Sequence, residues 1–345
     1  MASNNRIKWI DYSKAFACLL VVIGHLLMSL RAIDNYRNVT DFIVWFIYLF
    51  HMPLFMFLSG ILYHKQTNIS TLKDYKTFEF KKIINLAIPY VTFYSITMIL
   101  SMIFSNSVNT PKGLDEWIGI INNPMAPYWF LYALLSIFII VPLLEKLFKN
   151  NKNIVLFIFA ILKIISIFII PNIYFIKSIM MYGFYFYLGA FIKIDEKNDN
   201  NKNYLIIMLP LLFFILAIVF YLFKGVINGI IIKYIEILFA IAGIFVVTYL
   251  FKYVNKSKFF DTYKKYTLHI FLMHTIFAAG IRIVMYNIGI YNYFVHLIIG
   301  LLFSIYIPVL VGIISDKIGI TNFFFYPLKT IEEYKKGKKQ WQKRS

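Results

Sequence analysis

The sequence contains a single cysteine, Cys18, and few acidic residues, with 16 Asp and Glu against 35 Lys and Arg. One cysteine excludes an intrachain disulfide and a metal site built from several cysteines. The first apolar run is too long for a signal-peptide core and no small-residue cleavage site follows it, so we expect no cleavable signal peptide. Internal repeats and paired broken helices are also lacking, which disfavours a transporter built from inverted repeats.

Apolar residues are what the sequence has in excess. Hydrophobic residues make up 60% of the 345 positions, whereas a soluble domain is about 45–50% apolar. We therefore predict an all-α integral membrane protein, a bundle of about ten spans that each approach the ~20 residues needed to cross a bilayer. The expected spans are 9–30, 41–62, 84–105, 128–148, 154–171, 174–192, 204–223, 229–251, 267–286 and 293–314.

The basic residues predict the orientation of these spans. The odd-numbered connections hold only a few of them, namely Arg31, Arg37, Lys112, Lys177, Lys224 and Arg282. Most of the rest lie in the N-terminal segment, the even-numbered connections and the C-terminal tail. Because cytoplasmic segments carry the positive excess, we expect both termini in the cytoplasm. The net charge of +19 then reflects topology and contact with anionic phospholipids, and we expect no nucleic-acid partner.

The chain divides into a membrane domain, residues 1–326, and a basic cytoplasmic tail, residues 327–345, which is too polar to span. The longest outside connection, residues 106–127, contains several proline and glycine breakers and is a candidate cap over an outer cavity.

The first span carries an acid, a lysine and a histidine, which are Asp11, Lys14 and His25. Lys14 and His25 are eleven residues apart, so in a helix they differ by only about 20° and project from one face roughly 16 Å apart. Such residues usually face a protein interior or a wet cavity. The alternative is that Lys14 reaches the interface and His25 makes one interhelical hydrogen bond.

Further histidines lie in the second and ninth spans. His51 is near the middle of the second span, two residues before Pro53. His269 and His274 are about 140° apart on a helix, so one of them is expected to serve packing. Lys233 and Glu236 are three residues apart and are expected to pair, whereas Lys163 has no evident partner. Nothing fixes a common spacing for the histidines, so no metal site is predicted.

Four stretches together resemble acyltransferase family 3, bacterial ten-span proteins that acylate sugars. They are DYSKAFACLLVVIGH, FHMPLFMFLSGILY, YWFLYALL and TLHIFLMH, in that order between Asp11 and His274. The HMPLFMFLSG run is most similar to the fucose 4-O-acetylase-like branch. The family's basic residue and histidine, ten residues apart, fall on Lys14 and His25, although many members have arginine first. Where paired arginines usually precede the third span, this chain has Lys82 and Asn85, and the terminal histidine of the ninth-span motif is His274.

The resemblance implies an O-acyltransferase of the bacterial plasma membrane with no permanently bound cofactor. Acyl-CoA, in the simplest case acetyl-CoA, is the expected donor, and a cell-surface or lipid-linked glycan is the expected acceptor. The candidate catalytic residues are His25, Asp11, His51 and His274, with Lys14, Lys81 and Lys82 as candidates for binding the CoA phosphates. A neutral imidazole can take the proton of the attacking hydroxyl. No G-x-S-x-G elbow marks a nucleophile, which favours direct transfer over a covalent acyl-enzyme.

Two other functions fit the composition. A glycan transporter or flippase would use its histidines in a proton relay, and a non-catalytic subunit of a polysaccharide assembly complex would use them only for packing. The four ordered motifs favour the enzyme.

Overall fold

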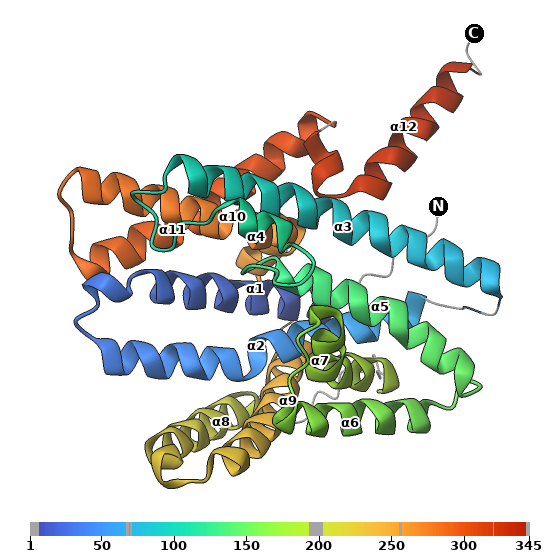
Figure 1. Cartoon of the computed structure of the whole chain (residues 1–345), viewed down its shortest axis with the longest axis horizontal. Coiled ribbons are helices and arrows are strands. Elements are labelled where there is room, and N and C mark those ends of the chain that lie inside the picture. The colour runs from blue at the N-terminus through green and yellow to red at the C-terminus, as the bar shows by residue number, and fades with distance from the viewer. Residues whose placement is uncertain are drawn as a thin grey trace. The chain divides into compact units, whose positions relative to one another are not determined.

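The computed structural model describes residues 7–66, 69, 71–192, 203–254, 257–319 and 321–342, with only the backbone for residues 66, 203 and 337–342. Every regular element in this part of the chain is a helix (Figure 1). Eight of the described helices are long and apolar enough to cross a membrane. The predicted class, an all-α multi-pass membrane protein, is therefore confirmed.

The chain forms two compact units, each assembled from segments far apart in the sequence. Unit 1 comprises Met1–Thr67, Asn151–Ile170 and Met180–Thr267, and unit 2 comprises Asn68–Asn150, Pro171–Ile179 and Leu268–Ser345. Two helices, α7 (Tyr174–Phe191) and α10 (Lys258–Asn287), contribute residues to both units.

Unit 1 is built around α2 (Arg37–Gln66), which packs against α1 (Lys8–Ser29) and α9 (Gly229–Tyr253). The ribbons of α1 and α2 run side by side in Figure 1. The side chains of Tyr12, Leu54 and Met56 are fully buried in this unit. The remaining elements of unit 1 are η1 (Arg31–Ile33), α6 (Lys152–Phe168), α8 (Asn203–Phe223) and η2 (Lys224–Val226).

Unit 2 centres on α3 (Leu72–Ile103), which packs against α5 (Trp129–Leu147). Thr71 and Asp74 form a capping box at the start of α3, satisfying two backbone N–H groups that the helix itself leaves open. The other elements of unit 2 are α4 (Leu114–Ile118), α11 (Tyr293–Lys317), η3 (Thr321–Phe324) and α12 (Pro327–Gln342).

The predicted spans differ from the helices mainly at their ends. α3 begins at Leu72 and α10 at Lys258, although the spans were expected to begin at residues 84 and 267. The extra turns are rich in lysine, which forms helix readily but is not apolar, so hydropathy misses them. The expected spans at 154–171 and 174–192 correspond to α6 and α7, which are not among the eight candidate spans.

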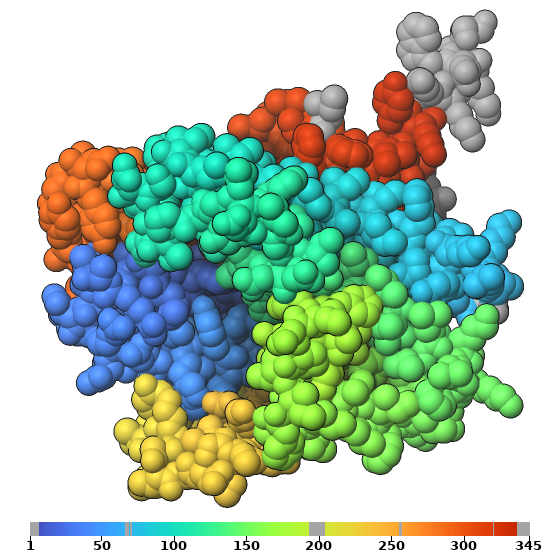
Figure 2. Space-filling model, viewed as in Figure 1, coloured from blue at the N-terminus to red at the C-terminus, as the bar shows by residue number. Residues whose placement is uncertain are grey.

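The outward face of α8 is almost wholly apolar. Leu211, Leu212, Ile215 and Leu222 are all close to half exposed or more, and the surface of this helix lies within the yellow region of Figure 2. In a soluble protein an exposed apolar surface of this kind marks an interaction site. In a membrane protein it is the surface expected to meet lipid.

Helices α2 and α7 approach each other through two glycines. A Cβ at Gly60 would lie well within 3.0 Å of the Phe186 carbonyl oxygen, and one at Gly189 would meet the Phe57 carbonyl oxygen equally closely. Backbone atoms cannot swing aside as a flexible side chain can. The small residues therefore allow the close contact on which this part of unit 1 depends.

We expect Gly60→Ala to lower the midpoint of thermal unfolding in detergent. Alanine gains roughly 1 kcal/mol of helix propensity over glycine, but overpacking typically costs about 1–3 kcal/mol, and the obstacle here is backbone. Gly280→Ala in α10 is the matched control, because a Cβ there has no neighbour within 4 Å. Equal unfolding midpoints for the two variants would show that α2 and α7 can move apart to accommodate the methyl group without loss of stability.

Candidate active site

Lys14 and His25 both lie on α1, which is one uninterrupted helix from Lys8 to Ser29. Both side chains are half-buried, and the helical spacing places them on one face roughly 16 Å apart. Asp11, also half-buried, occupies the first turn, where a carboxylate is favoured by the helix dipole. It precedes Lys14 by three residues and so neighbours it on the helix surface.

The environment of His25 is set by the contact between α1 and α2. A Cβ at the preceding residue, Gly24, would lie 2.7 Å from the Tyr48 ring, so glycine lets this ring pack directly against α1. The Tyr48 ring in turn lies 5.0 Å from the His51 ring, centroid to centroid. His25 and His51 interact electrostatically. Unit 1 thus brings together two of the candidate histidines.

His51 is buried, and its hydrogen bond defines its tautomer. Its Nδ1 lies 2.8 Å from the Ile47 carbonyl oxygen, and a carbonyl can only accept, so in a neutral ring Nδ1 carries the hydrogen. Nε2 then carries the lone pair and can accept a proton. Pro53 lies inside the same helix. It has no N–H to donate to the Leu49 carbonyl, yet α2 continues to Gln66.

Sequence reasoning missed a polar group at the N-terminal end of α1. The hydroxyl of the buried Tyr12 donates to Asp261 Oδ1 at 2.8 Å, and the Lys264 ammonium lies 2.6 Å from the same oxygen. These contacts fix the start of α10 against α1, close in sequence to Asp11 and Lys14. Tyr12 and Asp261 are 249 residues apart, and no local pattern signals their pairing.

His274 belongs to unit 2 and is buried. Its Nδ1 lies 3.0 Å from the Ile270 carbonyl oxygen and 2.9 Å from that of Phe271, so in a neutral ring Nε2 carries the lone pair. His269 packs instead against the aromatic turn after η3, with its ring 4.0 Å from that of Phe325. One of the two ninth-span histidines therefore has the packing role expected from their 140° separation.

Lys81 and Lys82, the other candidates for binding phosphate, differ in their surroundings. Lys81 is exposed, whereas Lys82 is half-buried, with its ammonium 4.1 Å from the centre of the Phe138 ring and in electrostatic interaction with Glu79. Asn85, which stands where the family usually has an arginine, accepts a hydrogen bond from the Leu328 N–H at 3.3 Å. It thereby caps the start of α12.

The connection between α3 and α5 is held against α3. Trp117 Nε1 donates to Ser95 Oγ at 3.1 Å, and the Tyr94 hydroxyl donates to the Glu116 carbonyl at 2.7 Å. The Gly113 N–H donates to the Glu116 carboxylate at 2.7 Å, which lowers the pKa of this carboxyl. These bonds order the segment that was expected to cap an outer cavity.

The lysine and glutamate of α9 do not pair as predicted. Lys233 donates to the Ile167 carbonyl at 3.1 Å, near the end of α6, where a cation is favoured by the helix dipole. Glu236 accepts instead from Trp45 Nε1 at 3.2 Å. Within the described ranges, no three His, Cys, Asp or Glu side chains gather as a metal site would require.

Comparison with known proteins assigns the chain to a family. A family model described as an acyltransferase domain matches residues 7–313. The chain is 35% identical over 157 residues to the nodulation protein NolL of Sinorhizobium fredii, and 30% identical over 150 residues to NolL of Mesorhizobium japonicum. These matches cover 42% and 41% of the chain but only 37% of each relative, so the matched region spans little more than a third of those proteins. No solved structure matches. Because the family model covers nearly the whole chain, the protein belongs to acyltransferase family 3, a family of membrane-embedded enzymes that transfer acyl groups other than aminoacyl groups.

Proposed function

We propose that the protein moves an acyl group, in the simplest case acetyl, from acyl-CoA to a hydroxyl of a cell-surface or lipid-linked sugar. The observation that carries this proposal is the pair Lys14 and His25 on one face of α1, with His51 on the adjoining helix. The two relatives bear the name of nodulation proteins, and the HMPLFMFLSG run of α2 is similar to fucose 4-O-acetylase-like sequences.

Lys14 at the N-terminal end of α1 would bind a CoA phosphate, because an ammonium is a strong donor to phosphate oxygens. Lys81, which is exposed, and Lys82, which lies over the Phe138 ring and interacts with Glu79, belong to unit 2 and stay candidates for binding phosphate on the ground of the family resemblance. The thioester would then extend along α1 toward His25. Asp11, beside Lys14, would orient its ammonium. The donor would approach from the cytoplasm, where the positive excess predicts that both termini lie, and the enzyme would reside in the bacterial plasma membrane.

In the transfer step, the sugar hydroxyl gives its proton to the imidazole of His25 as its oxygen attacks the thioester carbonyl. The new C–O bond forms a tetrahedral intermediate. Its collapse breaks the C–S bond, and the CoA thiolate leaves and takes the proton back from the imidazolium. No covalent acyl-enzyme is needed. His51 and His274, whose Nε2 atoms carry the lone pair when neutral, are the alternative bases.

Mass analysis of surface glycans tests this function directly. Cells with the gene should carry an acyl mass increment on a glycan, and cells with the His25→Gln variant or without the gene should lack it. A glycan that moves across the membrane without any change in mass would instead support a flippase.

A labelling experiment tests the orientation. Ser107→Cys lies in the exposed connection after α3, and Lys146→Cys is exposed in the last turn of α5. With both termini cytoplasmic, an impermeant thiol reagent should modify Ser107→Cys in intact cells and Lys146→Cys only after the cells are opened. The native Cys18 is buried and provides an unreactive background. The reverse pattern would contradict the orientation and the proposed route of the donor.

A further inference from the structure

Three lysines gather at the end of unit 1 where α6 ends and α9 begins; we call Lys163, Lys224 and Lys233 the lysine cluster. Lys163 lies in the second half of α6, Lys224 begins η2, and Lys233 is in the second turn of α9. The start of α2 and the end of α1 also lie here, because Lys224 interacts with Asp41 of α2, and Asp41 pairs with Arg31 just after α1. Positive charge is unexpected at this end of the unit, because the predicted orientation places most basic residues at the opposite end.

One carboxylate lies among the lysines. Lys163 and Lys224 both interact electrostatically with Glu236, which also accepts the Trp45 hydrogen bond. Among the residues that the structure describes, Asp41 is the other acid that interacts with Lys224 in this way. The Asp41 carboxylate is already paired with Arg31 at 2.7 Å and lies 3.8 Å from Arg37.

The charges at this end of the unit do not balance. Glu236, Asp41 and Asp34, which lies in the connection from α1 to α2, supply three negative charges. The cations that interact with Glu236 and Asp41 supply four positive charges, from Lys163, Lys224, Arg31 and Arg37. Lys233, bound to a carbonyl, adds a fifth. A charge near the bilayer core is costly unless it is paired or hydrated. The excess therefore favours an anion as a further partner.

Aromatic rings hold the lysines without neutralising them. The Lys224 ammonium lies 3.7 Å from the centre of the Tyr221 ring and 5.0 Å from that of Trp45, and the Lys163 ammonium lies 5.3 Å from the centre of the Tyr185 ring. Such contacts attract a cation through the ring quadrupole, but a ring has no net charge. They keep the ammonium groups in place and leave the excess unchanged.

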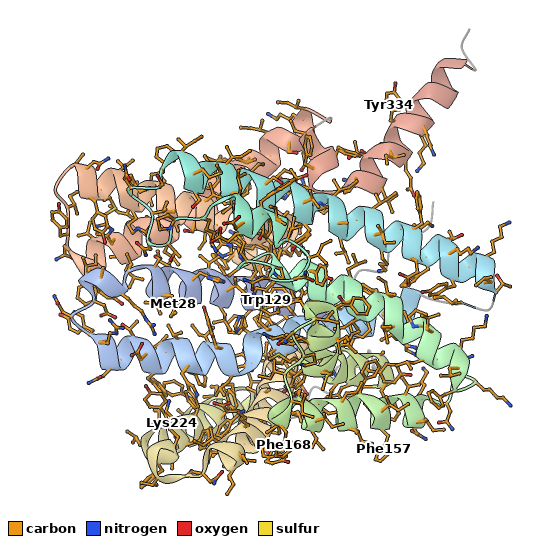
Figure 3. The ribbon with its side chains drawn as sticks, viewed as in Figure 1. Met28, Trp129, Phe157, Phe168, Lys224 and Tyr334 are labelled. Atoms are coloured by element: carbon orange, nitrogen blue, oxygen red, sulfur yellow. The ribbon has the colours of Figure 1, made fainter. Side chains whose placement is uncertain are left out.

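The side chains around the cluster are exposed and apolar. Phe168, Leu222 and Ile231 are each at least half exposed, and Lys224 and Phe168 are labelled where they border this end in Figure 3. A ligand here would meet cations and lipid-facing surface together. An anionic head group on an apolar tail has this combination, because phosphate oxygens accept hydrogen bonds from ammonium groups and the tail can pack against the apolar side chains.

We propose that the lysine cluster binds the phosphate of a membrane amphiphile. The phosphate of a lipid-linked acceptor and the phosphodiester of a phospholipid share this chemistry. The lipid-linked source rests on the proposed function, because it would bring the acceptor sugar to the enzyme on its carrier. Phosphate oxygens would accept from Lys224 and Lys163, and the tail would lie along α8 and α9.

Native mass spectrometry of the purified full chain tests the proposal. The probes are a polyprenyl monophosphate, a dioleoyl phosphatidylglycerol and an uncharged polyprenol, each added at equal concentration. The wild type should retain the polyprenyl phosphate at least about tenfold better than the polyprenol, and Lys224→Gln and Lys163→Gln should each lose about tenfold of this retention. Lys224→Arg should keep it, which separates loss of charge from loss of fold. Lys177→Gln is the matched control, because Lys177 is also half-buried over a tyrosine ring, 5.7 Å from the centre of Tyr174.

Competition identifies the source of the phosphate. If phosphatidylglycerol displaces the polyprenyl phosphate at equal concentration, the site takes bulk phospholipid, and if it does not, the site takes the carrier. Equal retention of polyprenol, or wild-type retention by both glutamine variants, would overturn the proposal. Loss of charge-dependent retention in a protein that still acylates glycans would refute this site alone. A protein that retains the phosphate but acylates no glycan would refute only the proposed function.

Discussion

Lys14→Ala is expected to raise the acyl-CoA concentration needed for half-maximal rate by ten- to a hundredfold, while the requirement for acceptor changes little. A hydrogen bond to a charged group contributes about 1.5–3 kcal/mol, and each 1.4 kcal/mol corresponds to about tenfold in affinity. Initial rates with one substrate varied at saturating levels of the other measure the effect.

Two variants control this result. Lys14→Arg keeps the charge and introduces the residue that many family members have, so its donor dependence should remain near that of the wild type. Lys8→Ala removes an exposed lysine of the same helix, whose ammonium lies 5.9 Å from the centre of the Tyr12 ring. If Lys14→Ala and Lys8→Ala behave alike, Lys14 serves only to anchor α1 at the interface.

The features predicted correctly from the sequence are those that depend on local spacing. Lys14 and His25 lie on one helix because an unbroken apolar run fixes both the helix and the angle between the two positions. Hydropathy alone also identifies the all-α membrane class. Hydropathy places the start of a helix too late where polar turns extend it, as at Lys258 in α10. Lysine disfavours membrane insertion but not helix formation.

Contacts between distant segments could not be predicted. Asp261 holds Tyr12 across 249 residues, and Trp45 binds Glu236 across 191. The second contact also explains why Lys233 and Glu236 do not pair: each finds a partner on another helix. The division into two units has the same origin, since each unit is made of segments that are not consecutive.

His25→Gln is expected to lower kcat by a factor of about 10²–10⁴, the typical contribution of a positioned general base. Glutamine keeps a hydrogen-bonding side chain of similar length but cannot take a proton at neutral pH. An interhelical hydrogen bond in a membrane averages only about 0.6 kcal/mol, so a purely structural role would leave the rate nearly unchanged. The variant should accumulate normally and still bind acyl-CoA, which separates lost chemistry from lost fold.

His51→Gln and His296→Gln complete the experiment. His296 is a buried histidine whose Nε2 lies 2.8 Å from the Ile290 carbonyl oxygen, so its replacement reports the cost of losing any buried imidazole, and we expect nearly full activity. His51 interacts electrostatically with His25 and carries its lone pair on Nε2 when neutral. If His25→Gln acylates at nearly the wild-type rate and His51→Gln does not, the proton goes to His51, and His25 is a structural neighbour. If both retain activity, His274 of unit 2 becomes the base to test, because its Nδ1 is likewise directed at backbone carbonyls and its Nε2 can accept the proton.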